Sequence, residues 1–434
     1  MKKILSIIFV FIILIGVSGC SNGIYQSVLL KSPDVFVTYD NYHNIDEKFL
    51  NNLSKFSSKL SFEYQDFYEI EDNFVISPVS IYMALAMVVE CSEGETREEV
   101  LNALGMTYDE VKTNTKLLFE ILTKEGKYGS KLMYKQMISN SIWFDKSLEL
   151  KDNILDSLAN DYYCYPYQTN FLNNNKQANK DIRNFVKEKT KGLIDQDFKL
   201  NDLTLFALIN TYYLKDVWIN DGDELSFTNE EYDFENRDKS IKKIKLMNGL
   251  YQDGRIQEYD TFKTFYTQTA NGTKIKFILP KDGYSIDDIY NYENIELVNG
   301  IKDYQATDSV NKVSYQTRCL FPKFESESNN DLSSLFAERF NVKTLFDSNK
   351  CDYTNITDTK DICCTKFAHM VKFKTDEVGM EGAAVTIVAN GAESIGGSTY
   401  EIIFEDFVID KSFAYIVTDS NDIMLFSGIV NDIE

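Results

Sequence analysis

The sequence predicts one large α+β domain over residues 45–434, and three observations lead to this fold class. Apolar residues recur at helical spacing in the first half, whereas strand-like patterns dominate after Lys243. With 44% hydrophobic residues and only five prolines in 434 residues, the chain has the composition of a globular protein. Neither a Pro/Gly/Ser-rich linker nor a repeat divides residues 45–434. We therefore expect one domain, although the length alone would also suit two or three.

The N-terminus has the features of an export signal. Lys2 and Lys3 precede an apolar run that ends at Val17, too short for a membrane span but typical of a signal peptide. The run is followed by Ser18-Gly19-Cys20, and this ending resembles the bacterial lipobox. The resemblance implies that residues 1–19 are removed and that Cys20 is lipidated. The simpler interpretation is an ordinary signal peptide with a chance cysteine.

Residues 20–44 follow this cleavage site. They are polar and irregular, so we expect a lipidated N-terminus and a tether that joins the membrane to the domain. Loss of the two lysines of residues 1–19 changes the formal net charge of −22 to −24. The sequence therefore predicts an acidic, extracytoplasmic protein, lipid-anchored to the bacterial cell membrane or envelope.

Four segments of the first half predict helices. Apolar residues at helical spacing begin after Asp46 and continue to Leu60. Ser77-Pro78 is typical of an N-cap followed by proline at the first helical position, and the helix after it is apolar on every side, as in a buried core. Thr96 and Glu99 have capping-box spacing, and Gly105 ends that helix. A fourth apolar stripe runs through Ile182 to Lys189.

Strands are predicted by apolar and β-branched runs. The run Leu203–Trp218 is nearly continuous in its apolarity, which indicates a strand covered on both faces. Further strands are expected over Thr273–Leu279, Lys312–Leu320 and Phe404–Ile409.

Charge and motif content exclude several classes of function. The chain has 45 Lys and Arg against 67 Asp and Glu, so its net charge is negative. This is the wrong sign for binding DNA or RNA through counterion release. Only His43 and His369 are available as histidine ligands, and HExxH, GxSxG, GxGxxG and Walker-type motifs are absent from the sequence. We expect no nucleic-acid partner, no cofactor and no metal.

Six cysteines follow Cys20: Cys91, Cys164, Cys319, Cys351, Cys363 and Cys364. An exported protein can pair them, but their spacing matches no disulfide framework and does not fix the connectivity. The adjacent Cys363 and Cys364 near His369 suggest a thiol nucleophile or a metal ligand. Buried, inert thiols are the preferred interpretation, because neither a second nearby histidine nor a CxxC pair supports the alternative.

Six motifs, in this order, resemble those of the serpin family and cover nearly all of residues 45–434. They are NFVISPVSIYMALAMV (Asn73–Val88), CSEGETREEVLNALG (Cys91–Gly105), LINTYYLKDVW (Leu208–Trp218), FPKF (Phe321–Phe324), DEVGMEGAAVTIV (Asp376–Val388) and the segment Asp410–Asn431. Leu214 and Ser412 depart from the family pattern, where phenylalanine and proline are usual, and Phe321 replaces the first residue of L-P-K-F. His369 lies ten residues before Gly379, where the family keeps a histidine.

The resemblance implies a fold and an activity. The fold is the serpin fold: a single large domain with a central, mainly antiparallel sheet, further β-sheets, a helical cluster and an exposed reactive-centre loop at about residues 377–403. The activity is that of a monomeric protease inhibitor and not of an enzyme. A target serine, or alternatively cysteine, endopeptidase cuts the loop and forms its acyl intermediate. The cut loop then inserts into the central sheet and traps the covalent complex.

The hinge of that loop is the most specific of the six motifs. The resemblance assigns it to Glu377, Gly379, Met380, Glu381, Gly382, Ala383 and Ala384. Side chains alternate along a strand, so if Met380 points inward then Gly382, Ala384, Thr386, Val388 and Asn390 do too, while Glu381 faces solvent. Insertion would therefore bury no charge. Met380 replaces the usual Thr or Ser and Gly382 has poor strand propensity, and both are expected to slow insertion without preventing it.

Other positions are assigned by the same resemblance. Ser77, Ser80, Asn210 and His369 match positions under the centre of the sheet, where the strands must part, and a buried structural histidine fits this role. Trp218 matches the aromatic residue at the top of the sheet, where insertion starts.

The scissile bond is assigned by family spacing alone. The family spacing places the scissile bond fourteen residues after Gly379, which is the bond Glu393-Ser394. A glutamate at this position indicates a glutamate-preferring protease. The loop is longer than usual, so Ala392, Ile395 or Tyr400 are alternatives, and Glu393 as a plain loop carboxylate is another.

Two other functions compete with inhibition. One is a non-inhibitory serpin used for binding, and the other is a surface lipoprotein that captures a ligand. The uncharged hinge argues against the first, and the ordered motifs argue against the second.

Overall fold

The computed structural model describes residues 25–34, 45–128, 131–218, 224–359, 362–364, 367–381 and 400–433. The α-helices are α1 (Glu47–Tyr68), α2 (Pro78–Cys91), α3 (Gly94–Leu104), α4 (Tyr108–Leu122), α5 (Asp152–Asp161), α6 (Phe171–Lys189), α7 (Ile286–Ile289), α8 (Tyr292–Asn299) and α9 (Ser333–Arg339), and a 3-10 helix covers Thr344–Phe346.

Within the described residues, four sheets accompany these helices. The largest, called the large sheet below, has the order β1 (Val28–Leu29), β5 (Cys164–Thr169), β4 (Lys131–Asp145), β6 (Phe206–Val217), β18 (Gly379–Met380), β17 (Ala368–Thr375) and β16 (Phe324–Asp331), with β3 (Lys124–Tyr128) beside β4. A second contains β11 (Gln257–Glu258), β12 (Phe262–Gln268), β13 (Lys274–Pro280), β20 (Phe413–Thr418), β21 (Met424–Val430) and β2 (Phe74–Ile76). A third is built on β15 (Val313–Phe321), which pairs with β9 (Met247–Asn248), β10 (Gln252–Asp253), β14 (Thr307–Asp308) and β19 (Glu401–Val408). The fourth pairs β7 (Tyr232–Glu235) with β8 (Ile241–Ile244).

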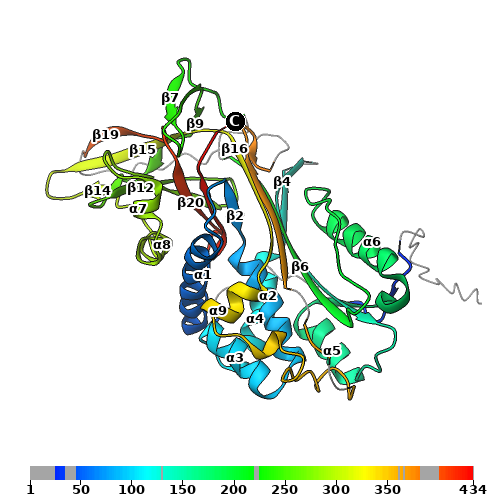
Figure 1. Ribbon diagram of the computed structural model, residues 1–434. Helices are drawn as coiled ribbons and strands as arrows, with labels where there is room; N and C mark the ends of the chain where they lie inside the picture. Colours follow the sequence, from blue (N-terminus) through cyan, green and yellow to red (C-terminus); the bar gives the residue numbers. More distant parts are fainter. Residues whose placement is uncertain are drawn as a thin grey trace, which may run out of the picture.

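Helices cover both faces of the large sheet. Helix α2 packs under β6 and β4 on the side of the main core, whereas α6 packs on the opposite face. Figure 1 shows most of the helices gathered at one end of the molecule and the sheets around β12 and β15 at the other, while the large sheet runs alongside, between the main group of helices and α6. The predicted α+β fold with a large central sheet is therefore confirmed. Within the large sheet β4 and β5 run parallel, while the other pairs are antiparallel.

The predicted helices form, with two corrections. Ser77 is the N-cap of α2, Pro78 is its first residue, and all fourteen of its residues are buried, as their apolarity predicts. Helix α1 extends beyond Leu60 to Tyr68. The capping box at Thr96 is wrong, because α3 begins two residues earlier at Gly94 and the Thr96 hydroxyl instead accepts a hydrogen bond from the Asp352 backbone amide at 3.0 Å.

The predicted strands also form, each within three residues of its expected ends. They are β6, β13, β15 and β19. In β6 the even-numbered side chains such as Tyr212 and Leu214 join the main core, whereas Ile209 packs in the smaller core under α6. The near-continuous apolarity of this run thus has the predicted cause, since α2 and α6 cover its two faces.

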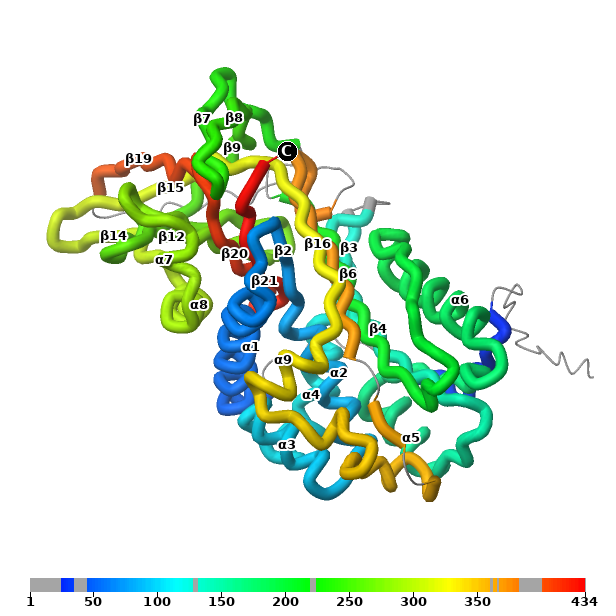
Figure 2. The backbone as a smooth tube through the Cα atoms, in the orientation of Figure 1, coloured from blue at the N-terminus to red at the C-terminus, as the bar shows by residue number. Residues whose placement is uncertain are grey.

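The segment before the domain is more ordered than the sequence suggests. Val28 and Leu29 form β1 and pair with β5 at the edge of the large sheet, so the expectation of an irregular tether is wrong for these residues. Asp181 of α6 accepts hydrogen bonds from the backbone amides of Gln26 and Ser27 at 2.9 and 2.7 Å. Figure 2 shows this segment beside α6. Within the described part of the chain, every helix is too short or too polar to cross a membrane.

Candidate functional site

The first residues of the hinge already lie in the centre of the large sheet. Gly379 and Met380 form β18, in which Met380 is paired with Asp216 of β6 on one side and Thr375 of β17 on the other. Only glycine fits at position 379, because a Cβ atom there would stand 2.2 Å from the Asp216 carbonyl oxygen. The hinge glycine predicted from the sequence is therefore required by close backbone packing.

Strands β6 and β17 of the large sheet are not paired with each other beyond β18. Both β6 and β17 are described along their whole length, and no hydrogen-bond ladder or isolated bridge joins one directly to the other. Among the described strands they are connected only through the two residues of β18. Each strand therefore presents backbone groups toward the place where a further strand would pair.

Trp218 fixes the backbone that leads into the hinge. Its indole Nε1 donates a hydrogen bond to the Asp376 carbonyl oxygen at 2.7 Å, and its backbone amide donates to Val378 at 3.1 Å. The indole is 3% exposed and stands edge-on to the ring of Phe321, with ring centroids 5.4 Å apart. The structure thus places Trp218 at the hinge, as the resemblance implies.

Glu377 begins the hinge and is held by an ion pair. Its carboxylate lies 3.1 Å from the Lys323 ammonium of the FPKF motif, and the Leu225 amide donates to its carbonyl oxygen at 2.7 Å. A backbone hydrogen bond, and then Lys323, lower the pKa of Glu377. The sequence motif contained Lys323, but its role as a partner of the hinge required the structure.

Met380 points inward in the structure, the orientation from which the alternation of the hinge was counted. Its side chain is fully buried in the main core. Directly across the strand pair lies Asp216, which is also fully buried, and burial raises the pKa of this carboxyl group to about 7. The Thr273 hydroxyl donates a hydrogen bond to Asp216 Oδ2 at 2.7 Å, while Asp216 Oδ1 has no hydrogen-bond partner. Sequence reasoning did not single out Asp216. It lies in the motif Leu208–Trp218, but nothing in that motif or in the hinge indicates that the two meet.

Glu381 departs from the expected exposed position. Its backbone has φ 46°, in the left-handed region, so the strand ends there. The side chain is half-buried, and burial raises the pKa of its carboxyl group to about 7 even though Lys374 and Lys215 lie nearby. The prediction that Glu381 simply faces solvent is therefore wrong for this conformation.

The four polar residues predicted under the sheet do meet α2, as two separate pairs. His369 Nε2 accepts the Ser77 backbone amide at 3.2 Å, and burial lowers the pKa of His369 to about 3, so the ring is neutral. Ser80 Oγ is hydrogen-bonded to Asn210 Oδ1. Asn210 and His369 are not hydrogen-bonded to each other, in keeping with the parted strands on which they lie.

Asn140 extends the second pair and was missed by sequence reasoning. It accepts a hydrogen bond from Asn210 Nδ2 at 2.5 Å and donates its own amide to the Tyr162 carbonyl oxygen at 2.7 Å. An asparagine in a strand of this composition carries no signal until β4 and β6 are placed in register.

Several predicted site residues lie outside the described residues. They are Cys20, Gly382, Ala383, Ala384, Glu393 and Ser394. Their assignments stay predictions.

Comparisons with known proteins agree with this geometry. A family profile described as Serpin (serine protease inhibitor) matches residues 51–433. Curated relatives include alpha-1-antiproteinase of Rattus norvegicus, 25% identical over 73% of this chain and 74% of the relative. They also include the leukocyte elastase inhibitor of Homo sapiens, 24% identical over 82% of this chain and 92% of the relative.

Solved structures show the same fold. Native tengpin, a thermophilic serpin, has a TM-score of 0.74 at 23% identity and covers 94% of this chain and 100% of its own. Thyroxine-binding globulin, solved in complex with thyroxine, has a TM-score of 0.71 at 19% identity, with 89% and 99% covered. Since the family profile spans most of the chain, this protein belongs to the serpin family.

Proposed function

We propose that this serpin inhibits a serine, or alternatively a cysteine, endopeptidase by trapping it as a covalent acyl-enzyme. One observation carries the proposal: the hinge enters the large sheet between two strands that are not paired with each other. The loop that follows Glu381 is thus attached at the entrance of the position it would occupy.

The proposed reaction is a race between two steps. The protease nucleophile attacks the scissile carbonyl, the peptide C–N bond breaks, and the new amino end leaves while the other half stays bound as an ester or thioester. Water would normally hydrolyse this bond. Strand addition between β6 and β17 supplies backbone hydrogen bonds on both sides of the loop and carries the enzyme along before hydrolysis occurs.

The side chains near the entrance suit this insertion. Met380 already fills an inward position without a charge, and Gly382 and Ala384 follow at the next inward positions of the predicted alternation. Glu381 must leave its left-handed backbone conformation and become extended, which releases its carboxyl group from a half-buried site where burial disfavours its charge. We propose Glu393-Ser394 as the scissile bond, with a glutamate-preferring protease as the target.

A protease panel tests the function. We expect the full chain, incubated with serine and papain-like cysteine proteases that include a glutamate-specific enzyme, to give a complex that survives SDS and boiling. Mass spectrometry of the released C-terminal fragment identifies the bond that was cut. Clean cleavage of the loop with full protease activity across the panel would contradict inhibition and favour a non-inhibitory serpin or a ligand-binding surface lipoprotein.

We also propose that residues 1–19 are a signal peptide, that a lipid on Cys20 anchors the monomeric domain outside the cytoplasm, and that the domain begins near residue 45. Four residues separate Cys20 from Tyr25, which stacks on Tyr167 at a ring-centroid distance of 6.2 Å. Five residue steps span at most about 17 Å, so a lipidated Cys20 would hold the β1–β5 edge of the sheet close to the membrane surface.

Replacement of Cys20 tests the anchor. In a producing bacterium, Cys20→Ser should abolish labelling with a fatty-acid analogue and release the protein from the membrane fraction, because the acceptor thiol is lost. Ser21→Ala, one position further on, should keep both properties. Unchanged membrane association of Cys20→Ser would contradict the anchor.

A further inference from the structure

Three partly exposed thiols lie in the connection between α9 and β17. They belong to Cys351, Cys363 and Cys364, whereas Cys91, Cys164 and Cys319 are buried. The expectation that Cys363 and Cys364 are buried is therefore wrong, because both are partly exposed.

Cys351 and Cys363 are in contact although twelve positions separate them. Cys351 Sγ lies 3.0 Å from the carbonyl oxygen of Ile362, the residue before Cys363. Cys363 Sγ lies 3.2 Å from the Leu345 carbonyl oxygen, and the thiols of Cys351 and Cys363 are close enough to interact with each other. A disulfide between them requires the two sulfur atoms to approach to a bond of about 2.0 Å.

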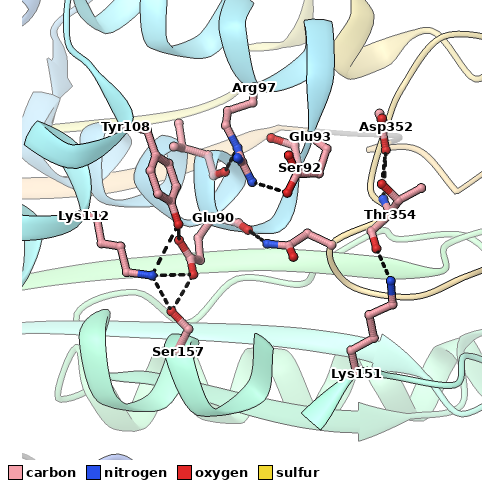
Figure 3. Close-up of polar contacts among 12 residues, drawn as sticks. Glu90, Ser92, Glu93, Arg97, Tyr108, Lys112, Lys151, Ser157, Asp352 and Thr354 are labelled. Atoms are coloured by element: carbon pink, nitrogen blue, oxygen red, sulfur yellow. Dashed lines mark hydrogen bonds and ion pairs between the residues drawn. The ribbon is translucent and has the colours of Figure 1, made fainter. Parts of the chain in front are cut away.

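Hydrogen bonds to the helical end of the molecule hold the chain just after Cys351 in place. The Asp352 carbonyl oxygen accepts the Glu93 amide at 2.9 Å, and the Thr354 carbonyl oxygen accepts the Lys151 ammonium at 2.7 Å. Asn355 donates its side-chain amide to the Glu90 carbonyl oxygen at 2.6 Å. Figure 3 shows Asp352 and Thr354 beside Lys151, next to the polar group around Glu90. The backbone after Cys351 is thus held by hydrogen bonds to three other residues of the helical end.

We propose that Cys351 and Cys363 form a disulfide when the protein meets a thiol-oxidising system. In this reaction one thiolate attacks an external disulfide, of an oxidoreductase or of glutathione, to give a mixed disulfide. The second thiolate then displaces the external sulfur. One S–S bond forms in the protein, the external S–S bond breaks, and the two protons and two electrons of the protein thiols pass to the external disulfide, which becomes two thiols.

The alternatives are less suitable. Burial raises the pKa of the Cys91, Cys164 and Cys319 thiols, which suppresses the reactive thiolate and leaves them inert. Burial also raises the pKa of Cys363, so the folded protein should react slowly and a catalyst or a prolonged incubation is needed. Cys363 with its neighbour Cys364 would close a strained ring across one peptide bond.

The disulfide would act on the strand that borders the opening of the sheet. It closes a loop of thirteen residues, counted from 351 to 363, and its second cysteine lies five residues before β17 begins at Ala368. Such a closure restricts the unfolded chain and should raise resistance to heat. It would also fasten the end of β17 to the segment that is bound to α2 and α3.

Peptide mapping tests the pairing. The purified full chain is incubated at pH 8 in a buffer of oxidised and reduced glutathione, alkylated and digested without reduction. We expect a loss of two hydrogen masses and one linked peptide pair that joins Cys351 to Cys363. The oxidised protein should melt a few degrees above the reduced one.

Variants distinguish the pair from its neighbours. Cys351→Ser and Cys363→Ser should each abolish the linked peptide and the difference in melting temperature, whereas Cys364→Ser should keep both. If Cys351 and Cys363 are both found alkylated after redox equilibration, they have not formed a disulfide and the proposal is wrong. A linked peptide that contains Cys364 would also overturn it. None of these readouts depends on protease inhibition or on the lipid anchor, so failure of the proposed function would leave the result interpretable.

Discussion

A Met380→Glu variant is expected to be cut by the target protease at the normal rate and to inhibit it poorly. Cleavage should continue because the proposed scissile residue Glu393 lies thirteen positions away. Inhibition should fail because Met380 is fully buried at the entrance of the sheet, directly opposite the buried Asp216, so a charge there should expel β18 from the sheet and insertion must then bury that charge. A second carboxyl group at that position adds the desolvation of a charge and its repulsion from the first.

The size of the effect follows from the race between insertion and hydrolysis. An uncompensated buried charge costs about 3 kcal/mol or more, and each 1.4 kcal/mol changes a rate roughly tenfold. Insertion should then slow on the order of a hundredfold while deacylation is unchanged. The measurement is the number of inhibitor molecules consumed per protease molecule inactivated, which should rise steeply.

Two control variants make this test specific. Met380→Leu keeps an apolar side chain of similar volume and should inhibit with the natural stoichiometry. Met380→Arg should impair inhibition less than Met380→Glu, since an arginine can form an ion pair with Asp216 across the strand pair. If Met380→Glu inhibits with unchanged stoichiometry, insertion of the hinge does not decide the outcome and the proposed mechanism is wrong.

Much of the fold could be predicted from the sequence because its signals are local. The Ser77-Pro78 start and the apolar surface of α2 predict a buried helix, and Gly105 ends α3 in the left-handed conformation that glycine permits. The capping box at Thr96 failed for a tertiary reason. Its hydroxyl bonds to Asp352, 256 positions later, and no local pattern reveals that partner.

The site could be predicted only in part, for the same reason. Gly379, Met380 and Trp218 belong to motifs, and the structure brings them together beside β6, while their roles in insertion stay predictions. Asp216 became relevant only through the register of β18 on β6. Glu381 was placed by strand alternation, which does not apply because its backbone turns out of the strand at φ 46°. The contact between Cys351 and Cys363 likewise depends on the path of the chain and not on spacing.

The second large effect is expected from Asp216→Asn, which should make the protein more stable at neutral and alkaline pH. Burial raises the pKa of Asp216 from 3.8 to about 7 in the folded state, against the smaller opposing effects of hydrogen bonds from Thr269 and Thr273 and of the charge of Lys124. The folded protein therefore binds this proton more tightly than the unfolded chain. The contribution of Asp216 to stability is fully present below about pH 4 and is lost as the pH rises toward 7. Asparagine has nearly the shape of the protonated acid and does not ionise.

The gain from Asp216→Asn should thus grow between pH 4 and 7 and then level off at roughly 4 kcal/mol, the value of a shift of about three pKa units. The measurement is the urea concentration at half-unfolding of variant and natural chain at pH 5, 6, 7 and 8. Differences that do not depend on pH cancel in this series. Asp238→Asn is a matched control, because Asp238 is exposed and hydrogen bonds from Ser240 lower its pKa, so it should show no such gain. A constant difference between Asp216→Asn and the natural chain from pH 5 to 8 would mean that Asp216 does not titrate in this range. The buried acid beside Met380 would then be ionised throughout, and Met380→Arg should impair inhibition less than it would beside a neutral Asp216.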